Sequence, residues 1–145
     1  MITLTPSQED ALRTCAGILG ANIEDLRAEI AFESAWRPDA KNPNGSARGL
    51  IQFIDRTSQA LGYRDSLHLV TLHPTIESQL LGPALRYLAP WKPFRSLQSL
   101  AMAIFAPSMR SAPEDSTFPL AIQRVNPGIR TVKDYMDKVR RVGVA

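Results

Sequence analysis

The stretch that decides the fold is residues 22–54, which read NIEDLRAEIAFESAWRPDAKNPNGSARGLIQFI. Asn22 can cap a helix, and the apolar residues that follow it recur at helical spacing through Ile30. Pro38 ends that pattern, and the turn signal NPNG at residues 42–45 marks a loop. The apolar segment GLIQFI at residues 49–54 closes the stretch. We therefore predict a helix, a tight loop and a buried segment that lie against one another.

Glu33 falls at the end of this helix, three positions after Ile30 and seven after Leu26. At about 100° per residue it continues their apolar stripe, so its carboxyl group is predicted to point toward the core. Partial desolvation and the nearby helix C-terminus both disfavour an anion and raise its pKa. A carboxyl group that keeps its proton near neutral pH can act as a general acid. We expect the other glutamates near it, Glu24 and Glu29, to be ordinary solvent-exposed residues.

The residues after Glu33 suggest a binding cleft. Gly45 and Gly49 allow the backbone to turn tightly or to approach a ligand closely. Gln52 lies in an otherwise apolar segment, and a buried amide needs hydrogen-bond partners, which sugar hydroxyls or loop backbone could supply. Trp36 offers an apolar wall beside the acid or, alternatively, an anchor in the core.

The rest of the chain is also helical in pattern, so we predict an all-α, single domain over residues 1–145. Expected helices run from Pro6 to Leu19, from Ile23 to near Glu33, from Asp55 to before Gly62, from Pro74 to Leu88, from Leu97 to Phe105, from Pro119 to near Asn126, and from Thr131 through Val139. Asp55 is expected to cap the third, Pro83 to break the fourth, and Thr131 with Asp134 to cap the last. The stretch from Gly62 to Val70 leaves room for a small β-hairpin.

Composition limits the classes of function. The chain has 145 residues, a net charge of +3 and scattered basic residues, so we expect no nucleic-acid partner. No apolar run approaches a membrane span, and residues 1–10 do not resemble a secretory signal. Cys15 is expected to be a buried, inert thiol. His68 and His73 lack further ligands at suitable spacing, so no metal or cofactor is expected.

The ordered pattern ESAWRPDA at residues 33–40, NPNG at 42–45 and GLIQ at 49–52 resembles the catalytic domain of soluble lytic transglycosylases. That family is related to goose-type lysozyme. The resemblance implies a lysozyme-like fold and cleavage of the β-1,4 bond between N-acetylmuramic acid and N-acetylglucosamine in peptidoglycan glycan strands. It also implies a 1,6-anhydro product and no second catalytic carboxylate.

The resemblance assigns roles residue by residue. Glu33 is implied as the acid and then the base. Ser34 should brace the acid or the floor of the cleft, Gln52 should bind sugar, and Ile51 stands where the family usually has methionine. The full set of implied substrate-binding residues is Ser34, Asn42, Gly49, Ile51, Gln52, Tyr87 and Phe105. Phe105 stands where the family has a tyrosine after a buried helix, so a hydroxyl group is missing there.

Two alternatives remain open at this point. Asp39 or Asp55 could hold a water molecule, which would make the protein a goose-lysozyme-like hydrolase. If the change at Phe105 abolishes catalysis, the protein would be a glycan-binding structural module of a virion. Residues 126–132 are similar to phage-type members, so we expect synthesis in the cytoplasm and partners among virion or tail proteins, or release to the cell wall.

Overall fold

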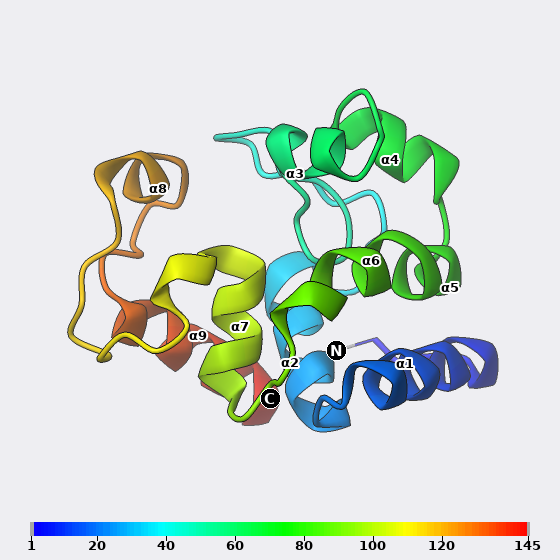
Figure 1. Ribbon diagram of the computed structural model, residues 1–145, viewed down its shortest axis with the longest axis horizontal. Coiled ribbons are helices and arrows are strands. Elements are labelled where there is room, and N and C mark those ends of the chain that lie inside the picture. Colours follow the sequence, from blue (N-terminus) through cyan, green and yellow to red (C-terminus); the bar gives the residue numbers. More distant parts are fainter. Residues whose placement is uncertain (1, 145) are drawn as a thin grey trace.

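The computed structural model describes residues 2–144, and these residues are mostly helical (Figure 1). The helices are α1 (Pro6–Leu19), α2 (Ile23–Ser34), α3 (Asp55–Ala60), α4 (Ser66–Leu72), α5 (Ile76–Gln79), α6 (Leu85–Leu88), α7 (Leu97–Phe105), α8 (Leu120–Val125) and α9 (Val132–Val144). Within residues 2–144 only isolated β-bridges form, so the predicted all-α class is confirmed. None of the described helices is both long and apolar enough to cross a bilayer.

The first two helices begin where their capping residues are. Thr5 and Gln8 form a reciprocal capping box at the start of α1, and Gly20 ends that helix in the left-handed conformation. At the start of α2, the Asn22 side chain accepts hydrogen bonds from the backbone N–H groups of Glu24 and Asp25. The short turn between these caps lets α1 and α2 pack together.

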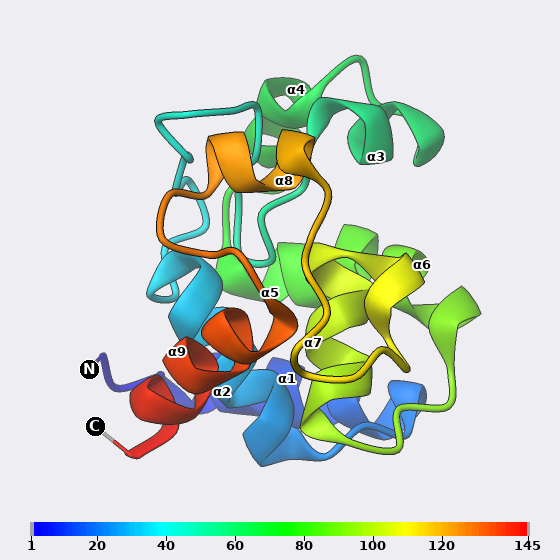
Figure 2. The same cartoon turned by 90° about the vertical axis from the view of Figure 1, so that its left-hand side faces the viewer.

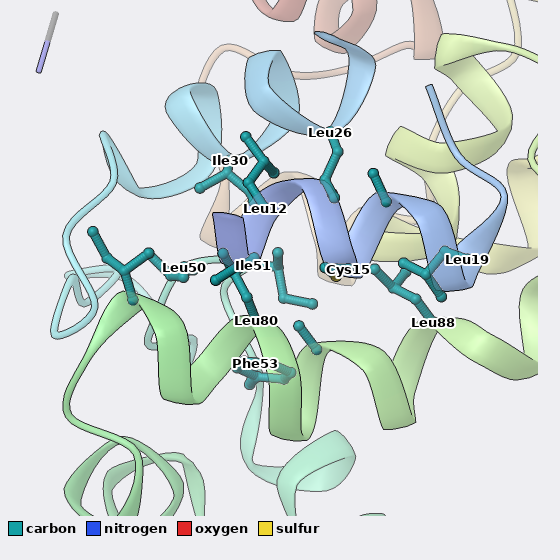
Figure 3. Close-up of a cluster of buried hydrophobic side chains, with 14 of the residues drawn as sticks. Leu12, Cys15, Leu19, Leu26, Ile30, Leu50, Ile51, Phe53, Leu80 and Leu88 are labelled. Carbon is teal, nitrogen blue, oxygen red and sulfur yellow. The ribbon is translucent and has the colours of Figure 1, made fainter. Parts of the chain in front are cut away.

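Helix α1 lies in the middle of the larger apolar cluster, between α2 and the α5–α6 segment (Figure 3). It contributes Leu12, Cys15 and Leu19, all at most 1% exposed. The segment at residues 50–53 enters the same cluster from the loop side. This packing joins the GLIQ segment to α2, so the loop that follows Glu33 has a fixed place relative to the helix that carries it.

A smaller apolar cluster lies on the other side of α2. It is formed mainly by α7 and α9, with Met102, Tyr135 and Met136 fully buried. Figure 2 shows α9 lying against α2, with α7 beside them. Because α2 is packed on both sides, its C-terminal turn is held between two sets of core side chains.

Three local predictions can be compared with the structure. The hairpin considered between Gly62 and Val70 does not form, because Asp65 caps α4 there. Asp55 is the first residue of α3 rather than its cap, and its side chain instead accepts a hydrogen bond from the backbone of Ser66. The break at Pro83 is confirmed as a widened, π-helical segment between α5 and α6.

Candidate active site

Helix α2 ends abruptly just after Glu33. Ala35 and Trp36 both adopt left-handed backbone conformations, with φ of 52° and 62°. Such conformations cost about 1 kcal/mol or more for residues other than glycine, so the surrounding packing must enforce them. Trp36 is buried in the larger apolar cluster and anchors this turn. It is therefore a core residue and not a wall of the cleft, and the chain leaves α2 with Glu33 in its last turn.

Glu33 lines a pocket of about 370 Å³. The pocket is lined by Phe32, Glu33, Ser34, Ala35, Arg37, Ala40, Lys41, Asn42, Pro43, Gln52, Phe105, Asn126, Ile129 and Tyr135. These residues come from the end of α2, the loop after it, α7, the segment after α8, and α9. Among these described residues Glu33 alone is acidic, and its side chain is half-buried.

Beneath the pocket, Glu33 belongs to a buried polar group of three side chains. The hydroxyl of Tyr135, from α9, is hydrogen-bonded to Oε1 of Glu33 and to Oε1 of Glu29. Glu29 lies one turn before Glu33 on α2 and is fully buried. The expectation that Glu29 is an exposed surface residue is therefore wrong.

Burial dominates the protonation of these groups. Desolvation raises the pKa of Glu33 to about 7, although hydrogen bonds with Tyr135 and Glu29 act in the opposite direction. The pKa of Glu29 is raised well above its usual range, first by burial and then by repulsion from Glu33. Burial likewise raises the pKa of Tyr135, so its phenol remains protonated. Glu33 can thus both give and take a proton near neutral pH.

The loop after α2 is fixed by the buried amide of Gln79 on α5. Its Oε1 accepts a hydrogen bond from the N–H of Leu50, and its Nε2 donates to the carbonyl groups of Pro38 and His73. Gly49 lies directly against this amide: a Cβ atom there would be 2.8 Å from Gln79 Oε1, and φ is +88°. Gly49 therefore shapes the loop and is not among the pocket residues.

Gln52 contributes a polar group to the pocket from a strained position, with φ of 57°. Its Nε2 donates to the carbonyl groups of Ala40 and Gly49. These two bonds orient the amide, so Oε1 is the atom that can accept a hydrogen bond from a ligand. Gln52 thus combines both roles considered for it, bracing the loop and lining the pocket.

Two further predicted residues line the pocket but bind the protein backbone. Ser34 donates its hydroxyl to the carbonyl of Ile30 within α2. Asn42 donates to the carbonyl of Val125, at the end of α8, and accepts from the N–H of Asn44. Asn42 therefore connects the turn at residues 42–45 to the segment that forms the opposite wall.

The remaining predicted residues divide between the pocket and the core. Phe105 lines the pocket, and its ring lies 4.3 Å from the ring of Tyr135, centroid to centroid. Ile51 is 2% exposed and lies in the core instead. Tyr87 donates its hydroxyl to the carbonyl of Ala103, away from the pocket lining.

The groups considered for other chemistries lie elsewhere. Neither Asp39 nor Asp55 lines the pocket. His68 accepts from the backbone of Arg64, and His73 is hydrogen-bonded to the hydroxyls of Tyr63 and Ser78. Within residues 2–144, no group of three or more histidine, cysteine or acidic side chains is arranged to hold a metal ion.

The comparison with protein families agrees with this geometry. Residues 21–81 match the family described as "Transglycosylase SLT domain". Over this stretch the chain is similar to that family. The match supports an SLT-type, lysozyme-like domain, and the family consists of lytic transglycosylases that act on peptidoglycan. The matched stretch contains Glu33, the loop and Gln79, and it ends before α7 and α9. No curated protein and no solved structure matches the chain.

Two site residues were missed by sequence reasoning. Tyr135 looks like one more apolar position of α9, beside Val132 and Met136, and its partner lies 102 positions away. Glu29 did carry a signal, because it lies four positions before Glu33 and so shares the same helix face. Phe105 has no hydroxyl group, and the phenol that is hydrogen-bonded to Glu33 is that of Tyr135.

Proposed function

We propose that this protein is a peptidoglycan lytic transglycosylase with Glu33 as its acid and base. The observation that carries the proposal is that one carboxyl group, with a pKa of about 7, faces the pocket. Glycosidases that use water generally place a second carboxylate across the scissile bond. Glu29 does not take that place, because it lies buried under Glu33 on the same helix.

In the proposed reaction, protonated Glu33 gives its proton to the glycosidic oxygen as the bond from that oxygen to C1 of the muramoyl sugar breaks. The C6 hydroxyl of the same sugar then attacks C1. Its proton passes to the Glu33 carboxylate, which restores the acid and yields a 1,6-anhydro end. The reaction needs one group that gives up a proton in the first step and takes one back in the second. A carboxyl group with a pKa near 7 can do both near neutral pH, because its protonated and ionised forms are then close in free energy.

The neighbouring polar groups support substrate binding in the same pocket. Oε1 of Gln52 can accept from a sugar hydroxyl or acetamido N–H, and the ring of Phe105 offers an apolar face. Arg37 and Lys41 also line the pocket and suit a substrate with acidic lactyl or peptide groups. These features favour a glycan that carries anionic substituents.

We further propose that the working domain extends beyond the matched stretch to the whole chain. The support is the contact of Tyr135 with Glu33, since it joins α9 to the acid on α2. The smaller apolar cluster, formed largely by α7 and α9, gives that contact a rigid base. A role in phage entry or lysis belongs to the same proposal and is supported by the similarity of residues 126–132 to phage-type members.

Digestion of purified peptidoglycan, followed by mass spectrometry of the muropeptides, tests the proposal. We expect 1,6-anhydro ends from the native protein and no products from Glu33→Gln. Glu24→Gln, which changes an exposed residue of the same helix, should keep full activity. Reducing ends would instead identify a hydrolase, and a folded native protein that binds glycan without cutting it would identify a binding module.

A further inference from the structure

The buried carboxyl group of Glu29 has no role in the reaction as described so far. It is fully buried, its Oε1 is hydrogen-bonded to Tyr135, and its Oε2 has no hydrogen-bond partner. Burying a carboxyl group with one oxygen left unpaired costs stability. The following inference rests on the proposed function, since it concerns how Glu33 is prepared for its work.

The number of available protons limits how the three groups can be hydrogen-bonded. The Tyr135 hydroxyl has one hydrogen, so it can donate fully to only one of the two carboxyl groups it contacts. The other contact is satisfied when a protonated carboxyl group donates to the hydroxyl oxygen. At least one of Glu29 and Glu33 therefore carries a proton in this arrangement, and the hydrogen bonds run in one of two directions.

The structure favours the direction from Glu29 to Glu33. An ionised Glu29 would leave a charged, buried Oε2 without a partner, whereas a neutral carbonyl oxygen there costs much less. The opposite direction would also commit the Glu33 proton to Tyr135, where no substrate could receive it. With Oε1 of Glu33 accepting from Tyr135, its Oε2 is left to exchange a proton in the pocket.

The charged groups around the pair do not reverse this preference. On α2 the titratable neighbour of Glu29 is Glu33, and on α9 it is Tyr135. Near these side chains α7 supplies buried apolar residues such as Met102. The cations Arg37 and Lys41 line the pocket above Glu33, and the Lys41 ammonium is bound to the carbonyl groups of Asn42 and Gly45.

We propose that Glu29 is a positioning residue: it keeps its proton on Oε1 and donates through the Tyr135 hydroxyl to Oε1 of Glu33. This series of two hydrogen bonds stabilises the Glu33 carboxylate after the proton of Glu33 has moved to the glycosidic oxygen. It also assigns proton exchange with substrate to Oε2 of Glu33. The Glu29 proton itself does not move during the cycle.

Two variants of Glu29 separate this role from a merely structural one. Gln can still donate an N–H to Tyr135 but cannot ionise, so Glu29→Gln should retain activity within about twofold and keep the native pH profile. Met fills similar space without a donor. For Glu29→Met, the loss of activity at alkaline pH should occur about one pH unit higher, because the Glu33 carboxylate loses support.

The direction in which the pH profile of activity shifts distinguishes the possible roles of Glu29. A downward shift in Glu29→Met would show that Glu29 is an anion in the native protein. A folded but inactive Glu29→Gln would show that its proton moves during the reaction. Unchanged profiles in both folded variants would reduce Glu29 to a structural residue. Each of these results would overturn the proposal.

A measurement without substrate keeps the test independent of the proposed function. In 13C NMR titrations of the carboxyl groups, we expect one buried glutamate to titrate near neutral pH and a second to remain protonated throughout. The signal of the second glutamate should disappear in Glu29→Gln. This variant therefore tests the assignment even if Glu29→Met does not fold. If Glu29 ionised at a lower pH than Glu33, the inference would be refuted. Absence of glycan cleavage alone would refute only the proposed function.

Discussion

Replacing Glu33 with glutamine should stabilise the protein at alkaline pH while abolishing its activity. Glu33 has a pKa of about 7 in the folded chain, compared with its ordinary value of 4.5. Each unit of such a difference corresponds to about 1.4 kcal/mol, so the ionised acid reduces the free energy of unfolding by about 3 kcal/mol. The glutamine side chain of the variant is uncharged at every pH and avoids this cost.

The sign of the pH dependence follows from where the proton is bound. Between pH 4.5 and about 7 the folded state holds a proton on Glu33 that the unfolded state has released. Native stability therefore falls as pH rises through this window and levels off above it. The assay is urea unfolding of the native protein and Glu33→Gln at about pH 4.5 and 8.5. The advantage of the variant should grow by about 3 kcal/mol between them.

Glu24→Gln is the matched control, because Glu24 lies on the same helix with an exposed side chain. The free energy of unfolding of this variant should not increase relative to that of the native protein as the pH rises. The reasoning would be refuted if Glu33→Gln and the native protein differed by the same amount at both pH values. That outcome would mean that Glu33 ionises in the folded state at its ordinary pKa.

Further substitutions test the loop and the tyrosine. Gly49→Ala should reduce the free energy of unfolding by about 2–4 kcal/mol, since its Cβ would collide with Gln79 at a left-handed position. In the same urea experiment Gly17→Ala, within α1 and with open space around it, should be neutral or stabilising. Tyr135→Phe should raise the pKa of Glu33, visible as an upward shift of the alkaline limit of activity, and an unchanged limit would contradict the hydrogen bond.

Much of the fold could be predicted because its signals are local. The capping residues of α1 and α2 are within three positions of the groups they bind. The last helix behaves in the same way, since Thr131 and Asp134 cap each other. Such patterns need only one turn of chain to be recognised.

The errors occurred where distant segments meet. Asp55 looks like a cap until α4 brings the N–H of Ser66 to its side chain. Of the predicted substrate-binding residues, Ile51 is buried in the larger apolar cluster and Tyr87 is partly buried against it, and neither lines the pocket. Gln79, which braces the loop through three hydrogen bonds, lies 29 positions from Leu50 and carries no pattern of its own.

Glu29 and Glu33 connect the candidate site to the stability of the fold. Two acids on the buried face of α2 oppose the stability of the helix that carries them. The helix tolerates them because apolar clusters pack against it on both sides, and Tyr135 reaches both carboxyl groups from one of those clusters. A sequence chosen for stability alone would place apolar residues at both positions. The departure from that pattern, two acids four residues apart on one face, is what the proposed acid–base role of Glu33 would account for.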